Sequence, residues 1–255
     1  MEHTTVVSVR NIVLGEGIPK ICIPLVSTSF PALLNDMKRA LEYGADLIEW
    51  RTDWMEDIFK EGYLEEILPT IRKAAGNTPL LFTFRTKKEG GNMAASLLQY
   101  KDLVKKAICS SLVDLVDIEL FSGREGVEEL VALAKEKNVK TIFSNHDFFK
   151  TPSENEILSI LKKMEEAGDH IAKIAVMPTW KEDVLTLLSA TCKAKKELSC
   201  PVITMSMAKA GLISRLSGEV FGSCLTFGAA GNVSAPGQIN ALKLRSVLEI
   251  LHENS

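Results

Sequence analysis

The amino-acid sequence predicts an α/β protein, a (β/α)8 TIM barrel with an N-terminal β-hairpin closing one end. Three observations support this fold class: eight short apolar segments recur along the chain, longer amphipathic segments separate them, and no Gly-x-Gly-x-x-Gly motif follows the first apolar segment. Strands that are apolar on both faces and are each followed by a helix indicate a parallel sheet covered by helices. Eight such units favour a closed barrel over an open, doubly wound sheet.

The expected strands lie in the eight apolar segments, and a hairpin precedes them. Residues 5–17, TVVSVRNIVLGEG, indicate two short strands that turn at Arg10-Asn11. The barrel strands are expected at residues 20–26, 46–51, 79–85, 112–120, 140–146, 170–177, 201–207 and 223–228.

Helices are expected between the strands, where apolar residues recur at three- and four-residue spacing. They are expected at residues 31–43, 95–110, 125–137, 153–167, 181–198 and 238–252. The second and seventh helices have no clear pattern. Ser153 and Glu156, directly after Pro152, predict a capping box at the start of the fifth helix, because each side chain can bond to a backbone donor there.

The composition fits one large domain, residues 1–255, that stays in the cytoplasm. The chain is 46% hydrophobic and contains no linker or low-complexity tract. No apolar run reaches the roughly 18 residues of a membrane-spanning helix. The first residues lack the basic and apolar regions of a signal peptide.

Charge and cysteine content limit the classes of function. A net charge of -3 and an isoelectric point near 5.9 provide no general attraction to nucleic acid or to an anionic membrane. The five cysteines are odd in number, scattered and without paired metal-ligand spacing, so we expect reduced core residues and no metal site. An anionic ligand is therefore expected to be small and held in a local pocket.

Polar residues at the ends of the apolar segments are the first candidates for an active site, because a parallel barrel carries its site at the carboxyl ends of its strands. These residues are Glu49, Arg51, Arg85, Glu119, His146 and Lys173. We expect all of them to converge on one mouth of the barrel.

Lys173 is the most informative of these residues. Its segment HIAKIAVM is otherwise nearly all apolar, and burying an ammonium group there is costly. Desolvation and nearby cations favour the neutral amine, which can condense with a ketone to form an imine. The candidate cations are Arg51 and Arg85. The alternative is a structural ion pair with Glu119 or another carboxylate.

His146 and Glu89 are candidates for proton transfer beside Lys173. His146 ends the strand before Lys173, and an imidazole with a pKa near neutrality can both take up and return a proton. Glu89 precedes Gly90-Gly91, where the backbone is free to bend its carboxylate toward the histidine. The alternatives are a hydrogen-bonded structural histidine and a solvated acidic residue in a loop.

A small anion site is expected near the end of the chain. Ser234 and Gln238 flank Pro236-Gly237 in SAPGQI, at the expected start of the last helix, where backbone donors and the helix dipole favour an anion. Arg215 can add a bidentate grip on a carboxylate, although a lone loop arginine is usually a surface residue.

The segments DLIEWR, LLFTFRTKKEGG, DIEL, SNHDFFKTP, KIAVMP, ITMSMAKAGLISRLSGEVFGS and SAPGQI together resemble the type I 3-dehydroquinate dehydratase family over nearly the whole chain. The resemblance implies an enzyme of the shikimate pathway, which leads to chorismate and aromatic amino acids, that removes water from 3-dehydroquinate to give 3-dehydroshikimate. Lys173 matches the family's Schiff-base lysine, His146 its general base and general acid, and Glu89 the residue that supports the histidine.

The resemblance also implies how the substrate is held. The positions that match the family's substrate-binding residues are Glu49, Arg51 and Arg85, toward the ring substituents, and Arg215, Ser234 and Gln238, at the substrate carboxylate. A homodimer, no metal and no organic cofactor are implied as well. Pro24 and Asn92 depart from the family's pattern, in which a serine and a glutamate occur, and leave the contribution of the first strand and the closing of the loop open.

Two other classes of function remain possible at the level of the sequence. One is another barrel with a lysine imine, such as an aldolase. A sugar-phosphate enzyme of that kind is expected to have a glycine-rich phosphate loop after its last two strands, which SAPGQI resembles only in part. The other is a binding or regulatory barrel without turnover, against which Lys173, His146 and Glu89 argue.

Overall fold

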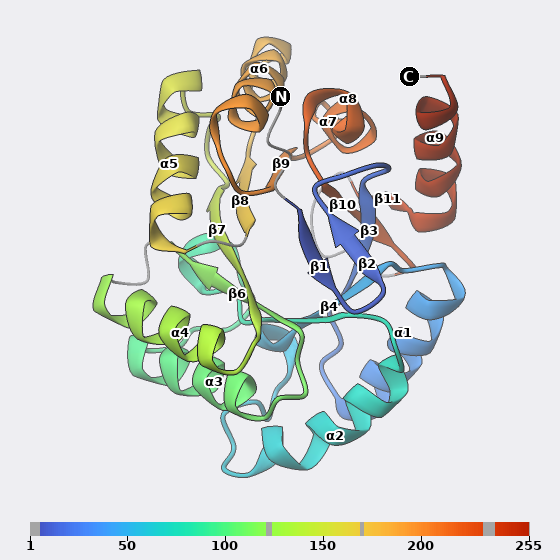
Figure 1. The fold of residues 1–255 in the computed structure, drawn as a ribbon. Coiled ribbons are helices and arrows are strands. Elements are labelled where there is room, and N and C mark those ends of the chain that lie inside the picture. The colour runs from blue at the N-terminus through green and yellow to red at the C-terminus, as the bar shows by residue number, and fades with distance from the viewer. Residues whose placement is uncertain (1–5, 121–123, 169–170, 232–237, 255) are drawn as a thin grey trace.

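The structure is a computed structural model, and it describes residues 6–120, 124–168, 171–231 and 238–254. A wall of eight parallel strands forms a barrel, with one strand at each place that the sequence predicts (Figure 1). The strands are β3 (Lys20–Leu25), β4 (Leu47–Arg51), β5 (Leu80–Thr83), β6 (Leu115–Glu119), β7 (Lys140–Asp147), β8 (Ile171–Val176), β9 (Val202–Ser206) and β10 (Leu225–Ala229).

The barrel closes between β9 and β10. Each strand from β3 to β8 pairs in parallel with the next one, and β10 pairs in parallel with β3. Between β9 and β10 the connection is a parallel bridge from Val202 to Ser223, with a hydrogen bond of 2.9 Å from the Cys224 N–H to the Val202 carbonyl. The predicted (β/α)8 barrel is confirmed.

Helices surround the barrel, and most of them lie where the sequence predicts. The predicted ones are α1 (Phe30–Glu42), α3 (Leu97–Cys109), α4 (Arg124–Glu136), α5 (Glu154–Ala167), α6 (Lys181–Glu197) and α9 (Ala241–Glu253). The capping box of α5 is present, since the Glu156 N–H donates to Ser153 Oγ and the Ser153 N–H donates to Glu156 Oε2. Within the described residues, no helix is both long and apolar enough to cross a membrane.

The second and seventh units, in which the sequence shows no clear helical pattern, also contain helices. The second helix, α2 (Tyr63–Ala75), contains Pro69, a residue that usually interrupts a helix. The seventh unit has two short helices, α7 (Leu212–Leu216) and α8 (Gly218–Phe221), which are too short to give a periodic pattern. Short 3₁₀ helices, η1 (Thr52–Trp54) and η2 (Lys87–Glu89), follow β4 and β5.

The expected start of the last helix is wrong by three residues. Residues 239 and 240 form a short strand, β11 (Ile239–Asn240), that pairs in parallel with Gly228 and Ala229 of β10. The helix begins at Ala241 because the Asn240 side chain accepts hydrogen bonds from the N–H groups of the first turn. Gln238 therefore precedes the strand and does not lie on the helix.

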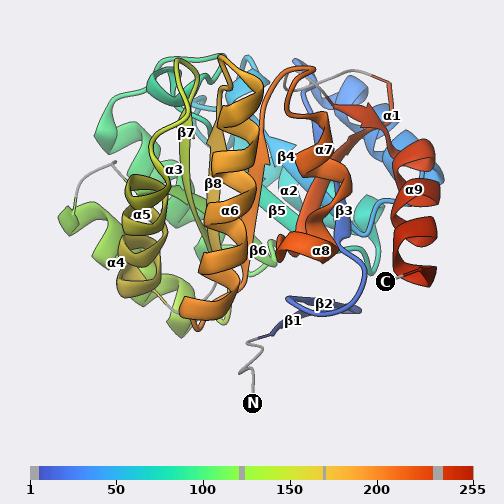
Figure 2. The same cartoon turned by 90° about the horizontal axis from the view of Figure 1, so that it is seen from above.

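The N-terminal hairpin covers one end of the barrel, as predicted. It consists of β1 (Val7–Val9) and β2 (Ile12–Leu14), and Arg10 at the turn has a left-handed backbone with φ of 49°. Figure 2 shows the hairpin across the lower end of the barrel. Its valines and leucine pack with the first inward residues of the strands, which include Leu47, Leu81, Leu115 and Ile142.

Side chains alternate along a strand, so every second residue points into the barrel. Two residues beyond the apolar layer that the hairpin seals, the inward positions of β4 to β8 are polar or charged, whereas β9 and β10 carry Met205 and Phe227. The polar or charged positions are Glu49, Thr83, Asp117, Ser144 and Lys173, and all of them are buried. The fold thus places a charged layer directly above an apolar plug.

The cysteine prediction is correct only in part. Cys22, Cys200 and Cys224 are buried, Cys192 is half-buried and Cys109 is exposed at the end of α3. All five are free thiols. An exposed cysteine at a helix end is a position that sequence hydrophobicity did not distinguish from the core.

Candidate active site

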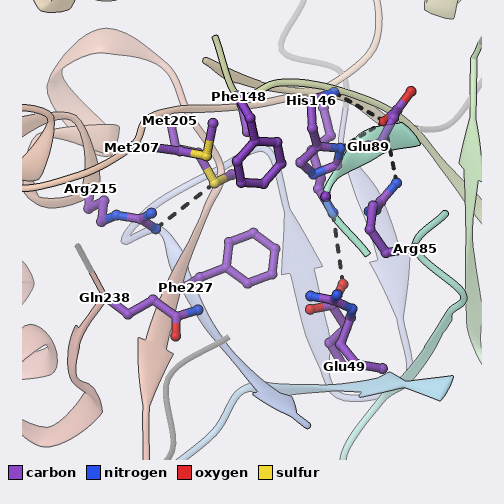
Figure 3. Close-up of a pocket in the computed structure, with 14 residues that line it drawn as sticks. Glu49, Arg85, Glu89, His146, Phe148, Met205, Met207, Arg215, Phe227 and Gln238 are labelled. Carbon is purple, nitrogen blue, oxygen red and sulfur yellow. Dashed lines mark hydrogen bonds and ion pairs between the residues drawn. The ribbon is translucent and has the colours of Figure 1, made fainter. Parts of the chain in front are cut away.

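A cavity opens among the carboxyl ends of the strands, and the predicted site residues lie around it (Figure 3). Of the predicted site residues in the described part of the chain, all but Glu119 line it; Glu119 bonds to Arg85 instead, and Ser234 lies outside the described residues. The predicted lining residues are Glu49, Arg51, Arg85, Glu89, His146, Lys173, Arg215 and Gln238. The sequence did not indicate the apolar part of the wall, which is Phe148, Ala175, Met205, Met207 and Phe227.

Lys173 points into the cavity from the third residue of β8 and is only 2% exposed. Its Nζ donates a hydrogen bond of 2.8 Å to Asp117 Oδ2 and lies 3.8 Å from Glu49 Oε1. The ring of Phe227 lies against the same nitrogen, with its centroid 5.1 Å away. The ion pair considered at the level of the sequence is therefore present, but its nearest carboxylate is Asp117 and not Glu119.

Asp117 is the residue of the site that the sequence interpretation missed. Oδ1 accepts a hydrogen bond of 2.6 Å from Ser144 Oγ, and Oδ2 lies 2.7 Å from Arg85 Nη2 in addition to its contact with Lys173. Burial would raise the pKa of this carboxyl, but Arg85 and Lys173 outweigh it and hold the pKa well below its usual range. Its position two residues before Glu119 on a strand is the signal that could have identified it.

Arg85 joins the carboxylates of this layer. Nη1 donates to Glu119 Oε1 at 2.9 Å and to Ser144 Oγ at 2.8 Å, while Nη2 contacts Asp117. Glu119 in turn accepts hydrogen bonds from the N–H and hydroxyl of Thr86, which fixes the start of the following loop. Burial opposes the charge of Arg85, but the surrounding carboxylates prevail and raise its pKa well above the usual value.

Glu89 and His146 form the second half of the charged layer. Glu89 Oε2 accepts a hydrogen bond of 3.1 Å from the His146 backbone N–H and shares one of 2.9 Å with His146 Nδ1. Arg85 Nη1 lies 3.6 Å from the same oxygen, so Glu89 lies between the two (Figure 3). This contact leaves Nε2 of the imidazole on the opposite side of the ring.

The surroundings shift both pKa values of this pair. Burial raises the pKa of Glu89 to about 8, against the lowering effect of Arg85. Burial also lowers the pKa of His146 well below its usual value, and the cations Arg85 and Lys173 act in the same direction. An uncharged imidazole in the cavity is the form that can accept a proton.

Two glycines shape the loop that carries Glu89. A Cβ on Gly91 would lie 1.8 Å from the Arg85 carbonyl oxygen, and one on Gly90 would lie 2.3 Å from the ring of Phe148. Gly90 also has a left-handed backbone with φ of 81°. The close approach of this loop to the strand end, which aims Glu89 at His146, therefore requires glycine at both positions.

Arg51 and Asp53 connect the same loop to β4. Arg51 donates through Nε and Nη2 to the two carboxylate oxygens of Asp53, each at 2.8 Å. Asp53 Oδ2 also accepts a hydrogen bond of 2.9 Å from the backbone N–H of Asn92. Because the donor is a main-chain group, this contact does not depend on the side chain at position 92. Pro24 lies beside Glu49 in the sheet, and β3 supplies none of the described lining residues.

Arg215 and Gln238 lie on the other side of the cavity from Glu89 (Figure 3). Arg215 is 2% exposed, and its Nη1 lies 3.9 Å from the sulfur of Met205. Burial lowers the pKa of Arg215 to about 10. The position is therefore a buried cation facing the cavity, and not the surface arginine that a loop location would suggest.

The described residues contain no group of three or more histidine, cysteine, aspartate and glutamate side chains placed to hold a metal ion. Asp117 and Glu119 are buried carboxylates beside the cavity, and both contact a cation of the protein. The arrangement combines a buried amine, a histidine with a carboxylate on its far nitrogen, and a cation across the cavity.

The fold and this cavity define the class of the protein as a (β/α)8-barrel enzyme with a buried lysine in its active-site cavity. Comparison with known sequences identifies the family, because a family model described as type I 3-dehydroquinase matches residues 21–255. The chain belongs to the type I 3-dehydroquinase family. It is thus a hydro-lyase, and the reaction of the family, dehydration of 3-dehydroquinate, is a step of the shikimate pathway.

Individual relatives agree with this assignment. The 3-dehydroquinate dehydratase of Bacillus subtilis is 48% identical over 251 residues, which cover 98% of both chains. That of Clostridium botulinum is 47% identical over 250 residues, with the same coverage. Among solved structures, the type I enzyme of Clostridium difficile with covalently modified comenic acid is 47% identical and has a TM-score of 0.96. The match covers 99% of this chain and 100% of the Clostridium difficile chain.

Proposed function

We propose that the enzyme converts 3-dehydroquinate to 3-dehydroshikimate through a Schiff base on Lys173, with His146 as general base and then general acid. The observation that carries this proposal is the buried amine of Lys173 in the cavity, on the strand next to the one that carries His146 near its end. The relative from Clostridium difficile contains a covalently modified ligand, and a nucleophilic lysine in this cavity is consistent with covalent chemistry.

In the proposed sequence, the neutral amine of Lys173 attacks the C3 ketone, and loss of water with uptake of one proton from solvent gives an iminium. The iminium acidifies the neighbouring C2 proton, which Nε2 of His146 removes to form an enamine. The enamine electrons expel the C1 hydroxyl while the protonated His146 donates to the departing oxygen. Water then hydrolyses the conjugated iminium, which releases the product and the lysine. No metal or organic cofactor is needed, because the iminium accepts the electrons.

Glu89 supports the histidine in this scheme. An ionised Glu89 accepts a hydrogen bond from Nδ1–H of His146, which fixes the tautomer that has a free electron pair on Nε2. It also stabilises the imidazolium that forms when the C2 proton is taken up. The nearby guanidinium of Arg85 favours the ionised form of Glu89.

The substrate would lie across the cavity between the two charged sides. A carboxylate at Arg215 and Gln238, with Ser234, would place the ring over Lys173 and its substituents toward Glu49, Arg51 and Arg85. A buried guanidinium is well suited to this, since charge-assisted hydrogen bonds to carboxylate are strong in a desolvated site. The homodimer and the cytoplasmic location expected from the sequence remain predictions.

Borohydride trapping tests the proposal directly. Treatment of the enzyme with borohydride and 3-dehydroquinate should reduce the iminium and leave an adduct on the peptide that contains Lys173, which mass spectrometry detects. A missing adduct would refute the covalent mechanism. Formation of 3-dehydroshikimate in a parallel assay without borohydride separates the dehydratase from an aldolase and from a binding barrel without turnover.

A substitution at His146 tests its separate role. His146→Ala should still form the adduct on Lys173 while losing dehydration by about 10²- to 10⁴-fold, since a positioned acid-base group contributes that much. Full activity in this variant would contradict the assignment.

A further inference from the structure

Asp117 bonds to the amine of Lys173. Of the two carboxylates near Nζ in the described residues, that of Asp117 is the closer one. The separation is 2.8 Å, against 3.8 Å for Glu49. The carboxylate is 1% exposed, so solvent does not screen this contact. The substrate side of Lys173 is the cavity, which means that Asp117 approaches the nitrogen from the barrel interior.

The charged and titratable groups facing this pair come from several surrounding elements. They are Cys22 on β3, Glu49 on β4, Arg85 after β5, Glu89 in η2, Glu119 on β6 and His146 on β7. Arg85 bonds to Asp117 and Glu119, so its charge is compensated within the layer. The net effect on the nitrogen of Lys173 is dominated by the carboxylate in direct contact with it.

We propose that Asp117 is the counter-ion of the reacting nitrogen, which keeps the Schiff base of Lys173 in its protonated, iminium form and orients it beneath the ketone carbon. This inference rests on the proposed function. It assigns to a residue outside the predicted set a contact with the atom at which the chemistry takes place.

The hydrogen bond to Asp117 can persist through every step. An ammonium and a ketone give an iminium and one water molecule, in which two N–H protons leave with the ketone oxygen and one N–H remains. That N–H continues to donate to Oδ2. When His146 removes the C2 proton, the electron pair moves into the C2–C3 bond and the nitrogen becomes neutral. Departure of the C1 hydroxyl, with a proton from His146, restores the positive nitrogen beside the carboxylate.

The protonated form matters because a neutral imine is a poor electron acceptor. A carboxylate within about 4 Å favours the charged form of a group, and this preference is stronger in a buried site. The same carboxylate opposes formation of the neutral amine that starts the reaction. Asp117 therefore favours the steps that follow imine formation, but it hinders imine formation itself at low pH. Removing its charge should affect these two stages in opposite directions, which gives a specific test.

Asp117→Asn removes the charge and keeps the shape. Its amide oxygen can still accept from Lys173 while its NH2 group donates to Ser144. We expect adduct formation with borohydride to continue, with the pH midpoint of trapping lowered by about 1 unit or more. Turnover at pH 7.5 should fall by about 10²-fold, as on removal of one electrostatic group from a transition state. Ser144→Ala, which removes the hydrogen bonds to Asp117 Oδ1 and from Arg85 Nη1 but keeps the charge of Asp117, is the matched control and should shift the midpoint by clearly less than Asp117→Asn does.

A measurement on the unsubstituted enzyme covers the case in which Asp117→Asn does not fold. With lysine labelled with ¹⁵N at the ε position and the bound substrate, the imine nitrogen should keep the chemical shift of a protonated iminium up to about pH 9, because the opposite charge favours that form. Loss of protonation near pH 7 would overturn the proposal, as would an Asp117→Asn trapping curve with the midpoint of the unsubstituted enzyme. Absence of any adduct in the unsubstituted enzyme would instead refute the proposed function.

Discussion

Replacing Arg85 by methionine is the sharpest test of the charged layer. The guanidinium is 3% exposed and contacts three carboxylates, with Nη2 2.7 Å from Asp117 and Nη1 2.9 Å from Glu119 and 3.6 Å from Glu89. Methionine has a similar length and no charge. The substitution therefore removes one cation from three buried carboxylates without leaving a large cavity.

The expected cost follows from leaving buried charges uncompensated. Breaking a buried ion pair from one side costs about 3–5 kcal/mol, so at neutral pH the free energy of unfolding should fall by that amount. For a chain of this size, this corresponds to roughly 6–20 °C in the midpoint of thermal unfolding.

The sign of the pH dependence is fixed by the direction of each pKa shift. In the unsubstituted protein the pKa of Asp117 is lowered, so its stabilising effect is present above about pH 4 and is lost only as the pH falls through the lower, folded value. In Arg85→Met the burial of these carboxyls should raise their pKa values. They would then destabilise the variant increasingly as the pH rises from 5 to 7.5.

Urea unfolding at pH 5 and pH 7.5 measures this difference. The difference in the free energy of unfolding between Arg85→Met and the unsubstituted enzyme should be larger at pH 7.5 than at pH 5. Lys105→Met is a control at an exposed ion pair with Glu129, and it should show no such pH dependence. A gap of equal size at both pH values would refute the reasoning that uncompensated carboxylates cause the loss.

Three further predictions concern catalysis. The value of kcat/KM should rise with pH toward about 8, because Glu89 has to lose its proton before Nδ1–H of His146 can donate to it. Glu89→Gln should flatten this pH profile and lower its plateau about 10²-fold. An unchanged pH profile in this variant would contradict the coupling between Glu89 and His146. Gly91→Ala would place a methyl against the Arg85 carbonyl, so kcat/KM should fall by about 10²-fold while circular dichroism shows a retained fold. Arg215→Met should raise KM for the substrate about 10- to 100-fold, because a charged hydrogen bond is lost; an unaltered KM would exclude the proposed carboxylate site.

The fold was predictable because its signal is repeated. Eight apolar segments of strand length, separated by amphipathic ones, lead to the same architecture even where single boundaries are wrong. The second and seventh helices were not predicted for local reasons: α2 contains Pro69, a residue that usually interrupts a helix, and the seventh unit is divided between α7 and α8. The error at residues 238–240 arose because the strand pairing with β10 is a tertiary contact, which the pattern of one segment does not contain.

The site was predictable where a polar residue interrupts an apolar strand, as at Lys173 and His146. The carboxylate that bonds to Lys173 was not predictable from the sequence, and the reason is geometric. In the hydrogen-bond register, Glu119 lies opposite Ser144, and Ser144 lies opposite Lys173, so Glu119 is the natural choice along the ladder. Strands in a barrel are tilted against its axis, so residues at one height come from different register positions. This tilt brings Asp117 to the nitrogen.

Arg85 links the two halves of the chemistry. Through Nη2 it holds Asp117 under Lys173, and through Nη1 it lies 3.6 Å from Glu89, which bonds to His146. When the histidine takes up a proton, Glu89 has to be ionised to stabilise the imidazolium, and the guanidinium favours that ionised form. The sequence interpretation assigned Arg85 to the substrate and to the cations that favour the neutral amine of Lys173. Its contacts instead indicate that one cation favours the ionised form of both the iminium counter-ion and the histidine partner, so its removal should impair amine and proton chemistry together.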